Sequence, residues 1–175
     1  RVALEVPAAD ARVAGPGLLV DGTRAWVARI DGRGQLGVAQ LALRRPGAPL
    51  SFEPLAKGAD TRFRPALARF GDHLAVAWVD GTGTPMRVRL ARLDRSGRLR
   101  SKHDVTLEAM GAAAPVFMRE ASPPLLLVVD PRAGMSPVVR VPLGPDGQPR
   151  AGRVALTVGQ VPEPRLGDHR PAQRR

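Results

Sequence analysis

Short apolar runs, separated by turn-forming residues, make up most of this chain. Residues 62–110 show the pattern best, because the first three runs there are followed by a turn with aspartate and glycine. In the third run Met86, Val88 and Leu90 alternate with Arg87 and Arg89, and this period of two is that of a β-strand with one buried face. The runs predict strands at 65–69, 73–79, 86–93 and, more polar, 104–108.

The same order of runs and turns occurs on both sides of this stretch. It predicts four strands in the first part of the chain, at 17–20, 25–30, 35–43 and 51–56. It predicts four more in the last part, at 115–119, 124–129, 136–143 and 153–158. Short strands with turn signals roughly every 8–12 residues are typical of an all-β fold. No stretch has a helical period, so we expect very little helix.

Three landmarks recur along the chain at nearly one spacing. Asp31, Asp80 and Asp130 lie 49 and 50 residues apart, and each follows an apolar run. Steps of 49 or 50 also separate two further sets, Pro16, Pro65 and Pro115, and Gly47, Gly97 and Gly147. A fixed period of this length is the mark of a repeat architecture. Four antiparallel strands in a repeat of about 40–50 residues predict one blade of a β-propeller.

The repeat also predicts how the chain is divided. We expect three four-stranded antiparallel blades, at residues 13–61, 62–111 and 112–160. Residues 1–6 closely match residues 153–158, so residues 1–12 are predicted to hold the last strand of a preceding blade and a linker. Residues 161–175 are expected to begin with a first strand and to end as a disordered basic tail.

The number of blades bears on what completes the fold. A closed propeller typically has at least four blades, and the repeat accounts for three. We therefore expect a partial or open propeller. It is interpreted as the C-terminal part of a larger propeller, and the alternative is an arc whose open edges meet a second copy of the chain.

Three segments of the second repeat resemble the sialidase-like propeller repeats of bacteria. They are a proline-led first strand, an apolar second strand ending in Val-Asp, and a Leu-Asp-x-x-Gly turn, at 63–67, 73–80 and 93–97. The resemblance implies that Arg64, in Phe-Arg-Pro, occupies the place of a carboxylate-binding arginine, although the isoleucine of that motif is missing. It also implies a secreted or cell-envelope protein.

Two kinds of residue are candidates for a site or for a structural role. Arg64 and Trp78 are the candidates for ligand binding. Trp26 and Trp78 precede their landmark aspartates by five and two residues, so they lie on opposite faces of the second strand, which favours packing between sheets over a sugar-stacking ladder. The landmark aspartates and glycines are predicted turn residues, because calcium needs about six to eight oxygen ligands and each loop offers one aspartate.

The residue types limit the chemistry. The chain has no Cys, which excludes disulfides and thiolate metal sites, and no Tyr, which is the nucleophile of sialidases. The three histidines share no metal-ligand spacing. We find no catalytic constellation and expect no enzyme activity and no cofactor.

Charge and apolar runs bear on partners. The net charge is +11 and the pI is about 11.7, but the arginines are scattered singly, as GC-rich coding also produces, which disfavours a nucleic-acid interface. The longest apolar run, residues 125–129, is far too short to cross a bilayer.

The sequence therefore predicts a non-catalytic binding or scaffold module that presents its loops, such as 80–85 and 131–137, to a protein or a glycan. One alternative is the non-catalytic remainder of a sialidase-like glycoside hydrolase whose active-site blades lie upstream. A third hypothesis is binding of an anionic polymer by the arginine-rich surface.

Overall fold

The computed structural model describes residues 13–44, 49–82, 87–105, 114–118, 124–129, 138–150 and 154–156. These residues form strands, turns and loops, and none of them is helical. The all-β prediction is therefore confirmed. The strands make three separate antiparallel sheets, in each of which every strand pairs with the next one in the sequence.

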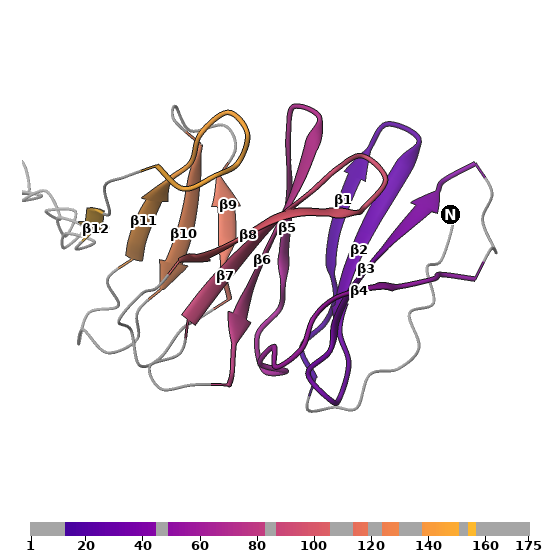
Figure 1. Cartoon of the computed structure of the whole chain (residues 1–175), viewed down its shortest axis with the longest axis horizontal. Helices are drawn as coiled ribbons and strands as arrows, with labels where there is room; N and C mark the ends of the chain where they lie inside the picture. Colours follow the sequence, from indigo (N-terminus) through magenta and orange to yellow (C-terminus); the bar gives the residue numbers. More distant parts are fainter. Residues whose placement is uncertain are drawn as a thin grey trace, which may run out of the picture.

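Each sheet is a simple meander (Figure 1). Sheet 1 contains β1 (Gly17–Asp21), β2 (Arg24–Ile30), β3 (Leu36–Ala42) and β4 (Glu53–Ala56). Sheet 2 contains β5 (Ala66–Phe70), β6 (His73–Asp80), β7 (Arg87–Leu93) and β8 (Leu99–Val105). Sheet 3 contains β9 (Val116–Met118), β10 (Leu125–Val129), β11 (Val138–Pro142) and the short β12 (Val154–Leu156).

One predicted strand is wrong in position. The fourth strand of the second repeat was expected at 104–108, but β8 begins at Leu99, directly after the turn. The amide of Asp94 donates to the carbonyl of Arg98 at 2.9 Å, and Gly97 has φ +85°. The chain thus reverses within a tight hairpin and pairs with β7 at once. Arg98 and Arg100 make this stretch polar, so an apolar pattern did not reveal the strand.

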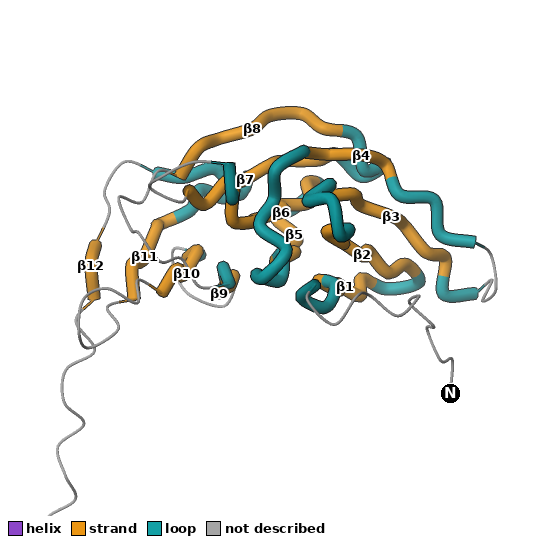
Figure 2. Tube along the Cα trace, turned by 90° about the horizontal axis from the view of Figure 1, so that it is seen from below, coloured by secondary structure: helices purple, strands orange, loops and turns teal. Residues whose placement is uncertain are grey.

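The sheets fan out from their first strands. Figure 2 shows β1, β5 and β9 along the concave side and β4 and β8 on the convex side. The first strands lie next to one another, β1 against β5 and β5 against β9. Two buried clusters fill the spaces between neighbouring sheets, one between sheets 1 and 2 and the other between sheets 2 and 3.

Sheet 2 is buried on both faces because it lies between the other two. Along β6, Val76 and Trp78 belong to the cluster shared with sheet 1, whereas Ala77 and Val79 belong to the cluster shared with sheet 3. Burial on both faces explains why β6 is a continuous run of apolar residues. A strand with one solvent-exposed face instead alternates between apolar and polar residues. Removal of this surface from water supplies most of the stability of such a core.

Turn glycines hold neighbouring sheets at close distance. Gly97, in the β7–β8 turn of sheet 2, lies over Trp26 of sheet 1, and a Cβ at this position would be 3.0 Å from the indole. Gly147 of sheet 3 lies over Phe70 of sheet 2 in the same manner, with the corresponding distance 2.8 Å. Both have positive φ, +85° and +77°, a conformation that glycine adopts without strain. The repeated glycine therefore lets the turn reverse and lets an aromatic ring approach it.

Several predictions concern residues outside the described parts. They are the strand and linker at 1–12, the tail at 161–175, Gly47, residues 83–85 of the loop at 80–85, Asp130 and the loop at 131–137. Among the residues that the structure does describe, no helix has the length and apolar character needed to span a membrane.

Candidate functional site

The landmark aspartates bind the backbone of their own turns. Oδ1 of Asp31 accepts hydrogen bonds from the amides of Arg33 and Gln35, both at 2.9 Å. Oδ1 of Asp80 accepts from the amide of Thr82 at 3.0 Å and from its hydroxyl at 2.6 Å. These are the contacts of an Asx turn, in which the carboxylate replaces a backbone acceptor.

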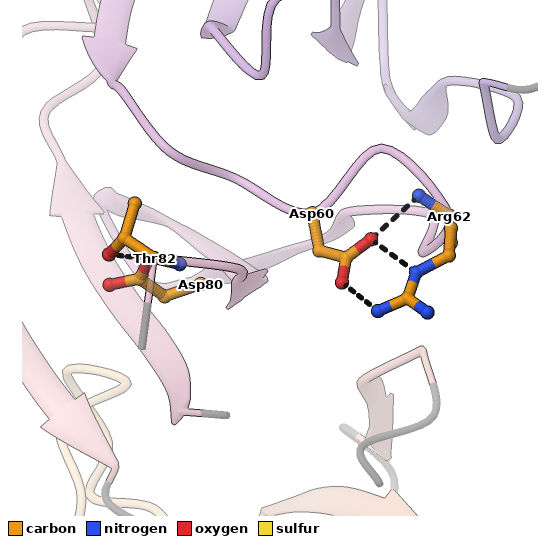
Figure 3. A network of polar contacts seen from close by, with 4 residues as sticks. All are labelled: Asp60, Arg62, Asp80 and Thr82. Carbon is orange, nitrogen blue, oxygen red and sulfur yellow. Dashed lines mark hydrogen bonds and ion pairs between the residues drawn. The ribbon is translucent and has the colours of Figure 1, made fainter. Parts of the chain in front are cut away.

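Two buried carboxylates lie where the linker between sheets 1 and 2 meets the end of β6 (Figure 3). Oδ1 of Asp60 accepts from the Arg62 amide and Nε, both at 3.0 Å, and Oδ2 accepts from Nη2 at 2.7 Å. The hydrogen bond from the Arg62 side chain lowers the pKa of Asp60. Oδ2 of Asp80 forms an ion pair with Nε of Arg89 at 2.6 Å.

Asp94 follows the same rule at the opposite end of the strands. Its Oδ1 accepts from the Ser96 hydroxyl at 2.6 Å and from the amides of Ser96 and Arg98 at 2.9 and 3.0 Å. The pKa of Asp94 is lowered to about 2, first by the Ser96 hydroxyl, then by these amides and Arg100. The aspartates of these turns are thus engaged in structural hydrogen bonds. The described residues include no group of three side chains suited to hold a metal.

Arg64 lies at a junction of sheets. Its side chain is exposed, and Nε donates to the carbonyl of Pro16 at 2.6 Å, which ties the start of β5 to the start of β1. The contact is close: a Cβ on Gly17 would lie 2.3 Å from the carbonyl oxygen of Pro65. Beside this junction is a shallow hollow of about 330 Å³, which Arg64 lines together with Leu18 and Val116. The structure therefore shows Arg64 in an inter-sheet hydrogen bond at the edge of an apolar hollow.

The two tryptophans occupy one layer. Trp78 is 1% exposed and Trp26 is 6% exposed, and both belong to the cluster between sheets 1 and 2. They come from opposite faces of equivalent strands, so Trp26 points from sheet 1 toward sheet 2 and Trp78 points back. At this depth the ring of Trp78 packs against apolar neighbours.

A groove lies between sheets 1 and 2. Its volume is about 450 Å³, and it opens where the β1–β2 turn meets the β5–β6 and β7–β8 turns. We call it the inter-sheet groove. Its lining combines apolar and charged side chains and includes Leu19, Asp21, Thr23, Arg24, Trp26, Arg69, Asp72, Leu74 and Arg95.

The charged rim of the inter-sheet groove is held in place by ion pairs. Asp21 of β1 pairs with Arg69 of β5 and so connects the two sheets. Asp72 pairs with Arg95 across the β5–β6 and β7–β8 turns. Nε of Arg69 also donates to the carbonyl of Gly71 at 2.8 Å. The Asp21–Arg69 pair thus links sheets 1 and 2 at the rim of the groove.

Sequence reasoning missed the inter-sheet groove and the Asp60–Arg62 pair. The groove is assembled from turns of two repeats that are about one period apart, and no local motif marks it. The Asp60–Arg62 pair had a local signal, Asp-Thr-Arg directly before the second repeat, because an aspartate two residues before an arginine can bind both its amide and its side chain.

The functional proposal for this chain rests on the geometry described above. No protein-family model matches the sequence, and no curated protein matches it.

Proposed function

We propose that this chain is a non-catalytic binding module built of three β-propeller blades, with the inter-sheet groove as its binding site. The propeller is supported by three four-stranded meanders that fan out from adjacent first strands, which is the arrangement of blades around a central axis. The engagement of Asp31, Asp60, Asp80 and Asp94 in turn hydrogen bonds supports a structural rather than a catalytic use of the carboxylates.

The observation that carries the proposal is the groove between sheets 1 and 2. Its volume of about 450 Å³ lies within the range of roughly 300–1,000 Å³ usual for binding pockets. Leu19 and Leu74 line the groove together with the charged residues Asp21, Arg24, Arg69, Asp72 and Arg95. This combination suits a short segment of a partner protein, which offers an apolar side chain together with polar groups.

The charges favour an acidic segment. Arg24, Arg69 and Arg95 on the rim outnumber Asp21 and Asp72 by three to two, and the whole chain has a net charge of +11. A positive field of this kind accelerates association with acidic partners and weakens as salt is added. Binding is therefore expected to decrease with ionic strength.

The test is a selection from a phage library of random dodecapeptides. Thr23→Trp places a large ring on the exposed rim of the groove, whereas Arg33→Trp places the same ring on the exposed β2–β3 turn, at the other end of the strands. Peptides enriched by the wild type should combine acidic and apolar residues, bind Arg33→Trp equally well, and bind Thr23→Trp at least about tenfold more weakly.

Two results would contradict the proposal. Enriched peptides that bind Thr23→Trp as tightly as the wild type would remove the groove as the site. Release of fluorophore from a panel of 4-methylumbelliferyl glycosides, at a rate proportional to protein concentration, would contradict the non-catalytic assignment.

A further inference from the structure

The lining of the inter-sheet groove contains more arginines than carboxylates. Asp21 pairs with Arg69. Asp72 pairs with Arg95. The remaining arginine of the lining is Arg24, whose side chain is exposed. No ion pair joins Arg24 to a carboxylate among the residues that the structure describes. Within this part of the chain, one positive charge of the groove therefore has no counter-charge.

The neighbours of Arg24 leave its charge uncompensated. Asp21 lies opposite Arg24 in the register of β1 and β2, but the carboxylate of Asp21 forms its ion pair with Arg69 of sheet 2. With its amide in the orientation that suits both groups, Gln40 accepts hydrogen bonds from Nε and Nη1 of Arg24, both at 3.2 Å. Gln40 is neutral. A carboxylate from a partner can therefore bind Arg24 without displacing an internal one, whereas at the other two arginines it would compete with an aspartate.

An apolar surface lies beside Arg24 on the same side of sheet 1. Trp26 lies two residues further along β2, and Leu19 of β1 lies directly opposite Trp26. Both residues line the inter-sheet groove together with Arg24. Residues two apart on a strand point to the same side and are separated by about 7 Å. The groove thus offers an apolar contact and an uncompensated guanidinium at a defined spacing.

We propose that Arg24 is the specificity-determining residue of the inter-sheet groove and that it binds one carboxylate side chain of the partner segment. The inference rests on the proposed function above, and it specifies the sequence of the partner. An extended segment also places side chains of alternate residues on one side, about 7 Å apart, which matches the spacing of Trp26 and Arg24. The partner segment therefore carries an apolar residue and an aspartate or glutamate with one residue between them.

The type of contact supports a carboxylate as the group that is recognised. A guanidinium binds a carboxylate through charge-assisted hydrogen bonds, often as a parallel pair. Complementary charges at an interface fix which partners bind and in which register. Since Arg24 is exposed, its substitution removes this recognition without opening the core.

The test uses the dodecapeptides selected on the wild type, synthesised with an amidated C-terminus so that only side chains supply carboxylates. The tightest peptide is compared, by fluorescence anisotropy, with a version in which the acidic residue of the motif is replaced by its amide. Arg24→Gln should weaken binding of the acidic peptide at least about tenfold and binding of the amide version less than about twofold. Arg33→Gln removes the same charge from the exposed β2–β3 turn and should change either affinity by less than about twofold.

The outcomes separate this inference from the proposed function. A purely structural role of Arg24 would weaken both peptides by the same factor, so equal losses would overturn the inference. Peptides that lose affinity with Thr23→Trp but not with Arg24→Gln would also overturn it, and the groove would remain the binding site. A selection that yields no peptide dependent on the groove would contradict the proposed function and this inference together.

Discussion

Replacement of Gly97 by alanine tests how the sheets are joined. An alanine at φ +85° costs roughly 1–2 kcal/mol in backbone conformation. Its Cβ would also lie 3.0 Å from the Trp26 indole, and overpacking of this kind costs about 1–3 kcal/mol more. We expect Gly97→Ala to lower the free energy of unfolding by about 2–5 kcal/mol, a large share of the roughly 5–15 kcal/mol of a typical domain.

Alanine substitutions at two other glycines separate the cost of the backbone conformation from the cost of overpacking. Gly22 has φ +58° and open space around its Cβ position, so Gly22→Ala should cost only the conformational part, about 1–2 kcal/mol. Gly32 has open space and no positive φ, so Gly32→Ala should change stability by less than about 0.5 kcal/mol.

Urea unfolding followed by circular dichroism measures these free energies. In a double-mutant cycle, Trp26→Leu should recover part of the cost of Gly97→Ala, because the smaller side chain leaves room for the added methyl group. Equal costs for Gly97→Ala and Gly22→Ala, with no coupling to Trp26, would refute packing of the turn on the indole.

Three further predictions follow from the contacts of single residues. Asp60→Ala should lower the free energy of unfolding in urea by about 1–3 kcal/mol, because the half-buried amide of Arg62 loses its hydrogen-bond acceptor. A decrease of less than about 0.5 kcal/mol would contradict this role. The pKa of Asp94 is about 2 in the folded protein and higher in the unfolded chain, so the stabilisation that its carboxylate provides is present above pH of about 4 and is lost as the pH falls toward 2. In thermal melts Asp94→Asn should therefore reduce the loss of stability between pH of about 4 and about 2. An unchanged dependence of stability on acid pH would contradict this role. Gly17→Ala should destabilise by at least about 1–3 kcal/mol, because its Cβ would lie 2.3 Å from the Pro65 carbonyl oxygen; wild-type stability would show that β1 and β5 are not so close.

Local pattern was sufficient for most of the fold. Alternation and turn residues predicted the positions of β7 and β11 to within one or two residues. A strand with one solvent-exposed face alternates between apolar and polar residues, and this period of two is visible in the sequence. The predicted position of β8 was wrong because the hairpin at Asp94 determines where this strand begins. Its own residues are too polar to show the apolar pattern of a buried strand. The β-propensity of a segment depends on its own residues, whereas its pairing in a sheet depends on the neighbouring strand.

The candidate site was less accessible from sequence. Arg64 was singled out by resemblance, and the structure places it in a hydrogen bond to Pro16 beside an apolar hollow. Trp78 was a candidate ligand residue, and the structure places it in the core at 1% exposure. The inter-sheet groove joins Asp21 to Arg69, 48 positions later, and such a meeting follows only from the packing of one sheet on the next.

The central claim is that successive repeats fold into sheets packed face to face, and nuclear Overhauser effects test it most directly. We expect cross-peaks from the Gly97 Hα protons to the Trp26 ring, and from the Gly147 Hα protons to the Phe70 ring, with both glycine resonances shifted upfield by the ring currents. Each pair joins two sheets. Strand-like shifts within each sheet but no cross-peak between Gly97 and Trp26 would contradict the account.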